Sequence, residues 1–408
     1  MKCRYCSSEL SLRLIDLGTA PPSNAYLTAS QLNMPERWYP LRVFVCTTCW
    51  LAQTEDFTQF DELFACDYAY FSSYSASWLD HAEKYVIEMI EQFNLHADSF
   101  VVEVACNDGY LLQKIKSRGI PCLGIEPTQS TALVAQSKGI NVKQEFFGAA
   151  LAERLLLEGN RADLMVANNV LAHVPNIGDF VRGFAVLLAA KGVATFEFPH
   201  LLSLIDACQF DTIYHEHFSY LSFTAVAEIF KSNGLKVFRV EQLSTHGGSL
   251  RVFAERSDSA VREEDSSVVE MLNLECNSGI KSIGFYSKLQ QRADDIKDKL
   301  LQFLIGAKAA GHMVVGYGAA AKGNTLLNYA GVKADLLRAV VDRSPAKQGK
   351  FLPGSRIPIF DEDYLANARP RYVFILPWNL RTELTNQLSY IRSWGGQFVS
   401  VIPELSII

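Results

Sequence analysis

The chain has 408 residues, of which 49% are hydrophobic and 20% are charged, a balance typical of a soluble globular protein. This length exceeds one ordinary core, so we expect two or three domains. The 38 Lys and Arg against 44 Asp and Glu give a net charge of −6, which argues against a nucleic-acid-binding surface. No apolar signal segment follows the first residues, and no apolar run is long enough to cross a membrane. We therefore expect a cytoplasmic protein without nucleic-acid or membrane partners.

Four of the nine cysteines form two matched pairs near the amino terminus, with two residues between the cysteines of each pair. In a reducing compartment this spacing is more typical of a metal site than of disulfides. Four thiolates can surround one Zn²⁺ tetrahedrally and leave no position for water, so we expect a structural zinc site. The alternatives, four unrelated thiols or a redox-active pair, fit the matched spacing less well. The predicted zinc ligands are Cys3, Cys6, Cys46 and Cys49.

Short apolar stretches alternate with helical stretches through most of the remaining chain. This alternation predicts βαβ units with parallel sheets. A charged amphipathic helix, predicted over 279–311, separates a first set of stretches from a second. We therefore predict an α/β protein in which a zinc-binding segment, 1–65, precedes two tandem Rossmann-like doubly wound domains, 66–280 and 281–408. The predicted strands lie within 100–106, 122–127, 162–171, 193–200, 236–243, 313–320, 336–342, 372–377 and 397–403.

The stretch FVVEVACNDGYLL (100–112) predicts a buried strand, a tight turn and the start of a helix. Small residues in the turn 105–109 allow a ligand to approach the backbone, and about 20 residues further on Glu126 could accept hydrogen bonds from ribose hydroxyls. Because the phosphate-binding pattern G-x-G-x-x-G is absent, S-adenosylmethionine, which has no phosphates, fits better than NAD. The predicted cofactor-binding residues are Glu103, Ala105, Asn107, Gly109, Glu126 and Asn168.

The stretch 162–171 ends in polar residues where the carboxyl edge of the sheet should lie. Ligands bind at that edge in open α/β sheets, so Asn168, Asn169 and His173 should lie near the cofactor. The alternative interpretation of His173 is a histidine whose hydrogen bonds only stabilise a helix start.

The stretch VVGYGAAAKGNTLLNYAG (314–331) predicts a second strand, glycine turn and helix. Backbone N–H groups at this helix start, together with Lys322 and Asn324, could bind an anion. The pattern is not a P-loop, which requires G-x-x-x-x-G-K-[ST]. A nucleotide-linked substrate would explain a second Rossmann-like unit, with Asp342 near its ribose or base. A duplication without a ligand is the alternative.

The segment DTIYHEHFSYLS (211–222) has the highest density of side chains that can move protons or bind a metal. His215 and His217 would share a face on a strand and diverge on a helix, and the helical zinc pattern H-E-x-x-H is absent. No third ligand is evident nearby, whereas a carboxylate beside an imidazole suits acid–base work near neutral pH. We therefore favour acid–base chemistry over a metal here.

Several segments resemble one family over essentially the whole chain. They are the two cysteine pairs, DYAYFSSYSASWLDHA, EVACNDGYLL, EFPHLLSLIDACQFDTIYHEHFSYLS, HGGSLR and GYGAAAKGNT, in that order. The chain resembles the S-adenosylmethionine-dependent sugar C-methyltransferases of deoxysugar biosynthesis, which methylate C-3 of nucleotide-linked 4-keto-6-deoxyhexoses. The resemblance implies S-adenosylmethionine, a structural zinc ion and a nucleotide-linked sugar substrate, for which we expect a dTDP-sugar. We also expect a monomer.

By the family's pattern, His217 resembles the base that removes the C-3 proton to give an enolate, although His215 lies only two residues away. The other predicted catalytic residues are Tyr214, Glu216, His173 and Tyr68. The nucleotide diphosphate would lie against Asn169, Lys322 and Asn324, between the last two domains. The predicted substrate-binding residues are Tyr74, Asn169, His200, His246, Tyr317, Lys322 and Asn324.

Two other classes of function remain open from the sequence. A nicotinamide-dependent oxidoreductase could use the second glycine turn, but its phosphate-binding pattern is incomplete. A non-catalytic nucleotide-sugar-binding protein would be expected to have lost the Tyr-His-Glu-His cluster, which is intact.

Overall fold

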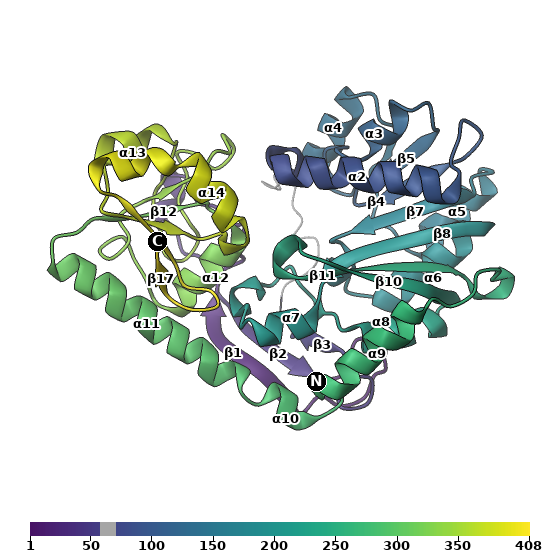
Figure 1. Ribbon diagram of the computed structural model, residues 1–408, viewed down its shortest axis with the longest axis horizontal. Coiled ribbons are helices and arrows are strands. Elements are labelled where there is room, and N and C mark those ends of the chain that lie inside the picture. Colours follow the sequence, from purple (N-terminus) through teal and green to yellow (C-terminus); the bar gives the residue numbers. More distant parts are fainter. Residues whose placement is uncertain (58–70) are drawn as a thin grey trace.

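The computed structural model describes residues 1–57 and 71–408, whose strands form three sheets. We name the three parts the amino-terminal unit (1–57), the middle unit (71–280) and the carboxyl-terminal unit (281–408). Figure 1 shows the middle unit on the right, the carboxyl-terminal unit on the left and the purple amino-terminal strands below and between them. Tyr68, one of the predicted catalytic residues, lies outside the described residues.

The amino-terminal unit is built on an antiparallel sheet that the sequence did not predict. Its strands are β1 (Leu12–Ala20), β2 (Tyr39–Val45), β3 (Ala52–Thr54) and β9 (Ser219–Tyr220), in this order across the sheet. Side chains of β2 alternate between buried and partly exposed, as expected for a strand with one face on a core. The fourth strand comes from the histidine-rich segment, since Ala52 pairs with Tyr220 and Gln53 with Ser219. This pairing attaches the predicted catalytic segment to the zinc-binding unit.

The middle unit is a seven-stranded α/β sheet. Its strands are β4 (Val101–Val104), β5 (Cys122–Ile125), β6 (Val142–Lys143), β7 (Ala162–Asn168), β8 (Leu188–Pro199), β10 (Leu235–Leu243) and β11 (Ser249–Arg256). The order is β10-β11-β8-β7-β4-β5-β6, with the strands from β6 to β8 parallel and the β10–β11 hairpin antiparallel. The five strands predicted here are confirmed, whereas β6 and β11 were not predicted.

Several helices of the middle unit begin at side-chain caps. Ser75 accepts a hydrogen bond from the backbone N–H of Trp78, and Asn176 and Ser222 cap two further helices in the same way. Such a cap is worth about 1 kcal/mol, and it fixes where the helix starts relative to the sheet. The helices are α2 (Ala76–Phe93), α3 (Leu112–Lys116), α4 (Gln129–Ser137), α5 (Ala149–Leu157), α6 (Ile177–Leu187), α7 (Leu201–Asp206), α8 (Phe223–Ser232) and α9 (Ser266–Ser278).

The carboxyl-terminal unit is a second α/β sheet in the order β14-β13-β12-β15-β16-β17, parallel except for β17. Its strands are β12 (Val314–Tyr317), β13 (Val340–Val341), β14 (Ile359–Phe360), β15 (Tyr372–Ile375), β16 (Gln397–Ser400) and β17 (Ser406–Ile407). Its helices are α10 (Ile283–Tyr286), α11 (Leu289–Ala309), α12 (Ala321–Tyr329), α13 (Asp363–Ala368) and α14 (Arg381–Gln387). Tandem Rossmann-like units behind a four-cysteine segment therefore agree with the predicted fold class.

The amphipathic helix predicted over 279–311 is divided between α10 and α11. The buried side chains of α11 recur every three or four residues, so they form one stripe along the helix. They are Leu289, Ala293, Ile296, Leu300, Leu304 and Ala307. Figure 1 shows α11 running along the lower edge of the carboxyl-terminal unit toward the amino-terminal strands.

The three units share a hydrophobic core, which contains Leu14, Phe210 and Leu326, one residue from each unit. Short 3-10 helices connect many of the longer elements of the described residues. They are η1 (Ser30–Asn33), η2 (Ser72–Tyr74), η3 (Leu171–His173), η4 (Phe210–Thr212), η5 (Thr245–Gly247), η6 (Ser257–Ser259), η7 (Trp378–Leu380) and η8 (Ser389–Trp394). Because η4 packs in this shared core, the histidine-rich segment that follows it lies where all three units meet.

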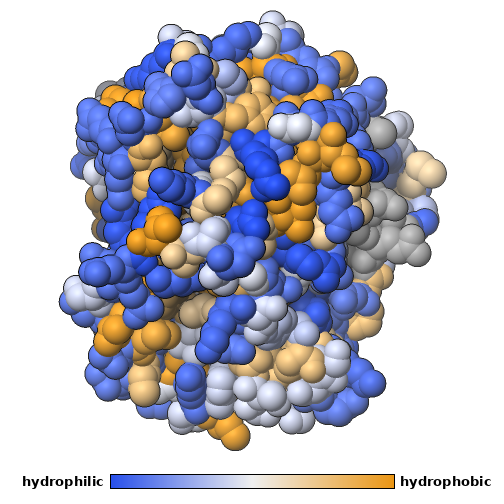
Figure 2. Space-filling view, turned by 90° about the vertical axis from the view of Figure 1, so that its right-hand side faces the viewer, coloured by the Kyte–Doolittle hydropathy of each residue, from blue (hydrophilic) through white to orange (hydrophobic). Residues whose placement is uncertain are grey.

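The outer face of the middle unit is largely hydrophilic. Figure 2 shows hydrophobic side chains there as patches interrupted by hydrophilic ones. No helix of the described residues is both long and apolar enough to span a membrane.

Candidate functional site: a cofactor turn, a histidine cluster and a cysteine cluster

The four predicted metal ligands come together. Sγ atoms of Cys3 and Cys49 lie 3.6 Å apart, those of Cys6 and Cys46 lie 3.5 Å apart, and all four lie within 4.8 Å of one another. Tetrahedral Zn²⁺ with Zn–S bonds of about 2.3 Å would place its sulfur ligands about 3.8 Å apart. The four thiols therefore have the separation that one zinc ion requires.

Two similar turns hold the cysteines. After the first pair, the N–H of Ser7 bonds the carbonyl of Cys3 at 2.9 Å, and after the second, the N–H of Trp50 bonds that of Cys46 at 2.8 Å. Ser7 and Trp50 have φ of 62° and 61°, so both turns close with a left-handed residue. Gln53 donates to the Cys3 sulfur at 3.2 Å, an outer hydrogen bond of the kind that orients metal ligands.

The turn 105–109 after β4 is tightly folded. Ala105, Asn107 and Gly109 have φ of 57°, 51° and 76°, so three of its five residues are left-handed. A Cβ on Gly109 would meet side-chain atoms of α4 and its C-terminal loop at 3.2 Å, which leaves no room for a larger residue. The turn is therefore a fixed platform beside the sheet.

Glu126 shapes this platform. Its carboxylate accepts the backbone N–H of Asn107 and that of Thr128, each at 2.9 Å. Burial raises the pKa of Glu126, and burial followed by the charges of Asp108 and Glu126 raises the pKa of Glu103 well above its usual range. Several buried carboxyl groups close together favour a ligand that offers positive charge and hydrogen-bond donors.

Four buried oxygen atoms at the carboxyl edge of the sheet have no hydrogen-bond partner among the described residues. They are Glu103 Oε2, Asp108 Oδ1, Asn168 Oδ1 and Asn169 Oδ1. Unpaired buried acceptors are rare in folded proteins and are best explained by an absent ligand that donates to them. S-adenosylmethionine fits, because it carries an ammonium group, ribose hydroxyls, an adenine amine and a sulfonium charge. When bound, it supplies an electrophilic methyl group.

His217 is held as a neutral imidazole. Its Nδ1 lies 2.9 Å from the carbonyl oxygen of Thr212, which can only accept, so Nδ1 carries the hydrogen and Nε2 keeps its lone pair. Burial, followed by the charge of His173, lowers the pKa of His217 well below its usual range. The rings of Tyr214 and His173 lie with centroids 4.0 and 4.6 Å from that of His217. The two rings pack against an imidazole whose Nε2 is unprotonated and can therefore accept a proton.

His215 points elsewhere. Its Nε2 lies 3.3 and 3.2 Å from the carbonyl oxygens of Tyr39 and Pro40 in β2, and its ring meets that of Tyr39 edge-on. The two histidines diverge because they lie in a turn, closed by the N–H of His217 on the carbonyl of Tyr214 at 2.9 Å. His215 therefore contacts the amino-terminal unit, whereas His217 contacts the rings of Tyr214 and His173.

Glu216 and His173 support the cluster from opposite sides. Asn24 donates to both carboxylate oxygens of Glu216 at 2.8 Å. The carbonyl of Glu216 lies 2.9 Å from Nδ1 of His173, and burial lowers the pKa of His173 to about 4. His173 is the last residue of η3, and its hydrogen-bonded ring packs on that of His217. Its place near the cofactor stays a prediction.

Asn169 and His246 meet above the sheet edge. The Asn169 side chain lies 3.2 Å from Nε2 of His246, whose ring packs on Trp78 with centroids 5.2 Å apart. Burial, followed by the charge of Lys322, lowers the pKa of His246 to about 4. The structure therefore brings these two predicted substrate-binding residues together.

Lys322 lies beside η4. Its Nζ bonds Asn379 Oδ1 at 2.7 Å and sits 4.6 Å above the ring of Trp378, whose Nε1 donates to Asp211 at 2.7 Å. Burial lowers the pKa of Lys322, and the charge of Asp211 opposes that shift. The lysine thus reaches the segment that holds His217.

Three of the other residues predicted to bind substrate make hydrogen bonds within the fold, and the fourth is exposed. Asn324 donates to the carbonyl of Ser23 at 2.6 Å, and His200 pairs with Glu275 at 2.7 Å. Tyr317 bonds Glu362 and accepts from Gln387 at 3.1 Å, and Tyr74 is 58% exposed. The described contacts of Asn324, His200 and Tyr317 join units or elements of the fold, and they place none of these side chains against His217.

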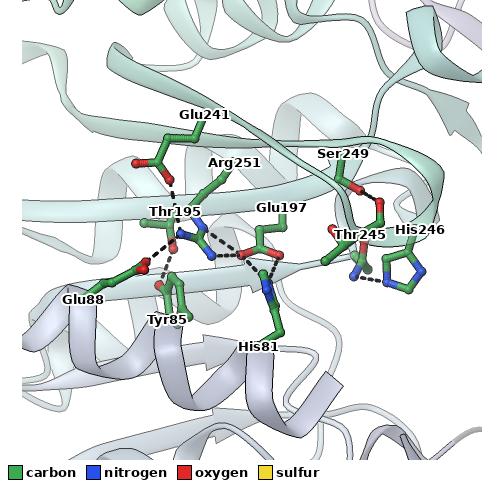
Figure 3. A network of polar contacts seen from close by, with 11 residues as sticks. His81, Tyr85, Glu88, Thr195, Glu197, Glu241, Thr245, His246, Ser249 and Arg251 are labelled. Carbon is green, nitrogen blue, oxygen red and sulfur yellow. Dashed lines mark hydrogen bonds and ion pairs between the residues drawn. The ribbon is translucent and has the colours of Figure 1, made fainter. Parts of the chain in front are cut away.

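A buried ion network at the end of β8 was missed by the sequence analysis. Glu197 bonds Nε2 of His81 at 2.8 Å and Nη2 of Arg251 at 2.7 Å (Figure 3). Burial raises the pKa of Glu197, but the hydrogen bond from His81 and the charge of Arg251 outweigh it and lower the pKa overall. The network ties α2 to the sheet beside His246. The available signal was the charge of Glu197 within the apolar run VATFEFP.

Three family models match successive parts of the chain. Residues 3–64 match a zinc binding domain, 78–240 a methyltransferase domain and 244–403 a C-methyltransferase C-terminal domain. The fold, the cofactor turn and these matches define the class: the chain is an S-adenosylmethionine-dependent methyltransferase with an amino-terminal zinc site.

Similar proteins identify the family within this class of methyltransferases. C-methyltransferase NovU of Streptomyces niveus is 33% identical over 407 residues, covering all of this chain and 96% of that protein. The chain therefore belongs to the C-methyltransferase family, as the sequence resemblance indicated. A ubiquinone biosynthesis O-methyltransferase of Azorhizobium caulinodans is 27% identical over 97 residues, 23% of this chain and 37% of that protein. A solved magnesium protoporphyrin IX methyltransferase of Synechocystis aligns with 44% of this chain and 79% of its own, at 17% identity and a TM-score of 0.34.

Proposed function

We propose that this enzyme transfers a methyl group from S-adenosylmethionine to C-3 of a dTDP-linked 4-keto-6-deoxyhexose. The observation that carries the proposal is His217, a buried neutral imidazole whose Nδ1 is bound by Thr212 and whose Nε2 keeps its lone pair. The name of the Streptomyces relative supports carbon as the methylated atom. In a keto sugar, only a carbon next to the carbonyl can lose a proton to so mild a base and become a nucleophile.

The proposed reaction begins with proton removal. Nε2 of His217 takes the C-3 proton, the C–H electron pair becomes the C-3–C-4 double bond, and the carbonyl π pair moves onto oxygen. The carbonyl of Thr212 stabilises the imidazolium that forms. The enolate pair then forms the new C–C bond to the methyl group as the C–S bond breaks with its pair left on sulfur. His217 afterwards returns its proton to water.

We propose supporting roles for the groups around this base. Tyr214 and His173 enclose the imidazole and exclude water, and Asn24 holds Glu216 so that the turn keeps its shape. The acceptors around the turn 105–109 bind the cofactor. Tyr68 remains a proposed active-site residue on the sequence resemblance alone. We also propose a monomer, which light scattering would test.

A substrate panel tests the proposal. The enzyme would be incubated with S-adenosylmethionine and nucleotide-linked hexoses, each offered with and without the 4-keto group and with a 3-hydroxyl or a 3-amino group. We expect a mass gain of one methylene group only for 4-keto sugars. Methylation of sugars that lack the ketone would contradict the enolate route.

A further inference from the structure

Lys322 occupies a position that its place in a glycine turn did not suggest. It lies in the first turn of α12, and α12 is fixed on the histidine-rich segment because Thr325 Oγ1 donates to the carbonyl of Ile213 at 2.8 Å. The preceding residue, Thr212, provides the carbonyl that binds Nδ1 of His217 at 2.9 Å. Two hydrogen bonds on adjacent residues therefore connect the lysine's helix with the proposed base.

In the part of the chain that the structure describes, no carboxylate forms an ion pair with the Lys322 ammonium, which is held by a neutral amide and an aromatic ring. Among the described residues, its one hydrogen-bond partner is the neutral amide of Asn379, at 2.7 Å, and its charge lies 4.6 Å above the Trp378 ring. Asp211, whose charge acts on Lys322, is fully buried and has one oxygen taken by Trp378 Nε1 at 2.7 Å. An ammonium has three N–H donors, so donors remain for a ligand oxygen.

Trp378 joins these groups to the loop that holds His246. Gly247 has φ of 89°, and a side chain at this position would collide with the Trp378 ring. Trp378 therefore contacts η5, supports Lys322 and binds Asp211 at once. The lysine is consequently fixed between two segments of the middle unit rather than carried on a free loop of the carboxyl-terminal unit.

Side chains of the carboxyl-terminal unit occupy part of the glycine turn before Lys322. The first N–H of the turn, on Ala319, is bound by the carboxylate of Asp342 at 2.7 Å, and Lys347 closes the same corner by donating to the Ala319 carbonyl at 2.9 Å. The amide nitrogen of Asn324 is engaged, so its remaining buried atom is a carbonyl oxygen, which repels phosphate. The Lys322 ammonium therefore remains as a charged donor that can meet a single oxyanion.

We infer that Lys322 is a catalytic residue whose ammonium donates a hydrogen bond to the sugar's carbonyl oxygen, next to the carbon that His217 deprotonates. The inference rests on the proposed function. As the C–H pair becomes the new C–C double bond, the carbonyl π pair moves onto oxygen, and Lys322 stabilises that charge. No proton need leave the lysine, and the enolate returns to a ketone when its pair forms the bond to the methyl carbon.

Two electrostatic effects support this role. Burial lowers the pKa of Lys322, which makes its ammonium a stronger donor toward an oxyanion. The charge of Lys322 also contributes to the lowered pKa values of His217 and His246, so its electrostatic field reaches both rings. Removing one preorganised donor from an oxyanion site commonly lowers kcat about 10²- to 10³-fold.

The test separates a carbonyl partner from a phosphate ligand. Lys322→Met, Lys322→Arg and the control Lys308→Met, which changes an exposed lysine of α11, would be compared in D₂O without S-adenosylmethionine. Exchange of the proton next to the ketone reports enolate formation, and titration with sugar-free dTDP reports diphosphate binding. Circular dichroism and S-adenosylmethionine affinity check that each variant is folded.

We expect Lys322→Met to exchange about 10²- to 10³-fold more slowly at saturating sugar, with dTDP affinity unchanged. Lys322→Arg should recover part of the rate, and Lys308→Met should match the wild type. Unchanged exchange in Lys322→Met, or lost dTDP affinity with normal exchange at saturation, would overturn the inference. If the wild type itself neither exchanges nor methylates any 4-keto sugar, the proposed function fails first and the inference fails with it.

Discussion

The two Rossmann-like units carry similar strand–turn–helix motifs that have been put to different uses. In the middle unit, buried oxygen atoms around the turn 105–109 after β4, such as Glu103 Oε2, have no hydrogen-bond donor in the part of the chain that the structure describes. In the carboxyl-terminal unit, the corresponding turn after β12 is closed by its own Asp342, which binds the N–H of Ala319 at 2.7 Å. Both turns are closed by the acidic residue that follows the next strand, since Glu126 accepts the N–H of Asn107 at 2.9 Å in the same way. They differ in their surroundings, because buried oxygen atoms of Glu103 and Asp108 lie around the first turn, whereas Lys322 lies beside the second. We propose that the same topology binds the cofactor in one unit and positions Lys322 in the other.

The largest expected effect comes from removing zinc, because the amino-terminal unit packs against both Rossmann-like units. We expect one zinc per chain by metal analysis. Cys46→Ser should lose the metal, and with it stabilisation on the order of 10 kcal/mol in the amino-terminal unit. Cys276, which is exposed and outside the cluster, provides the control Cys276→Ser with full metal content. A metal-free wild type with normal stability would contradict the zinc assignment.

Next in size is the loss of the proposed base. His217→Ala should lower kcat by about 10²- to 10⁴-fold, the usual contribution of a general base, while S-adenosylmethionine binding persists. His215→Ala is the matched control, because His215 contacts β2 through the carbonyls of Tyr39 and Pro40. We expect it to lose stability more than turnover. Steady-state kinetics and calorimetry measure both, and the reverse pattern would assign the base to His215.

A paired substitution addresses the two turns directly. Glu126→Gln removes an acceptor from the N–H of Asn107 or Thr128, so S-adenosylmethionine affinity should fall by about 1–3 kcal/mol. Asp342→Asn weakens the closed turn, so the free energy of unfolding should fall by a similar amount, about 1–3 kcal/mol, while cofactor affinity stays constant. Calorimetric titration and urea unfolding distinguish the two. A loss of cofactor affinity in Asp342→Asn would mean that the turns are not independent.

The last effect, a pH dependence of stability, builds up gradually with pH. His173 and His246 have folded pKa values of about 4, whereas an unfolded histidine titrates near about 6.5. Between these values the unfolded chain binds more protons, so stability should fall as the pH drops from 6.5 toward 4. The slope should reach at most about 1.4 kcal/mol per pH unit for each histidine. Denaturant unfolding at several pH values measures this slope, and flat stability over the window would show that these rings are not buried neutral.

The sequence predicted elements with strong local signals and missed those that depend on distant partners. The zinc ligands follow from the spacing of Cys3 and Cys6 and of their second pair, and the βα turns follow from apolar runs that end in small residues. The pairing of β9 with β3 could not be predicted, because two-residue contacts between remote segments leave no periodic pattern. For the same reason the partner of Glu197, Arg251 on β11, was invisible.

Lys322 illustrates the remaining difficulty. Its neighbours in sequence suggested an anion-binding turn, yet the carboxylate that closes the turn, Asp342, lies 23 residues from Ala319. The groups that surround the lysine, Asp211 and Trp378, come from two different units. Local spacing singled out this lysine as a candidate binding residue but could not show which distant groups would surround it.

The most direct test of the central claim is nuclear magnetic resonance of the product formed with ¹³C-methyl S-adenosylmethionine and a dTDP-linked 4-keto-6-deoxyhexose. The account predicts that the labelled methyl carbon is bonded to the sugar carbon next to the ketone, with the proton at that carbon lost. A label found on oxygen or nitrogen, or on a carbon remote from the ketone, would contradict it.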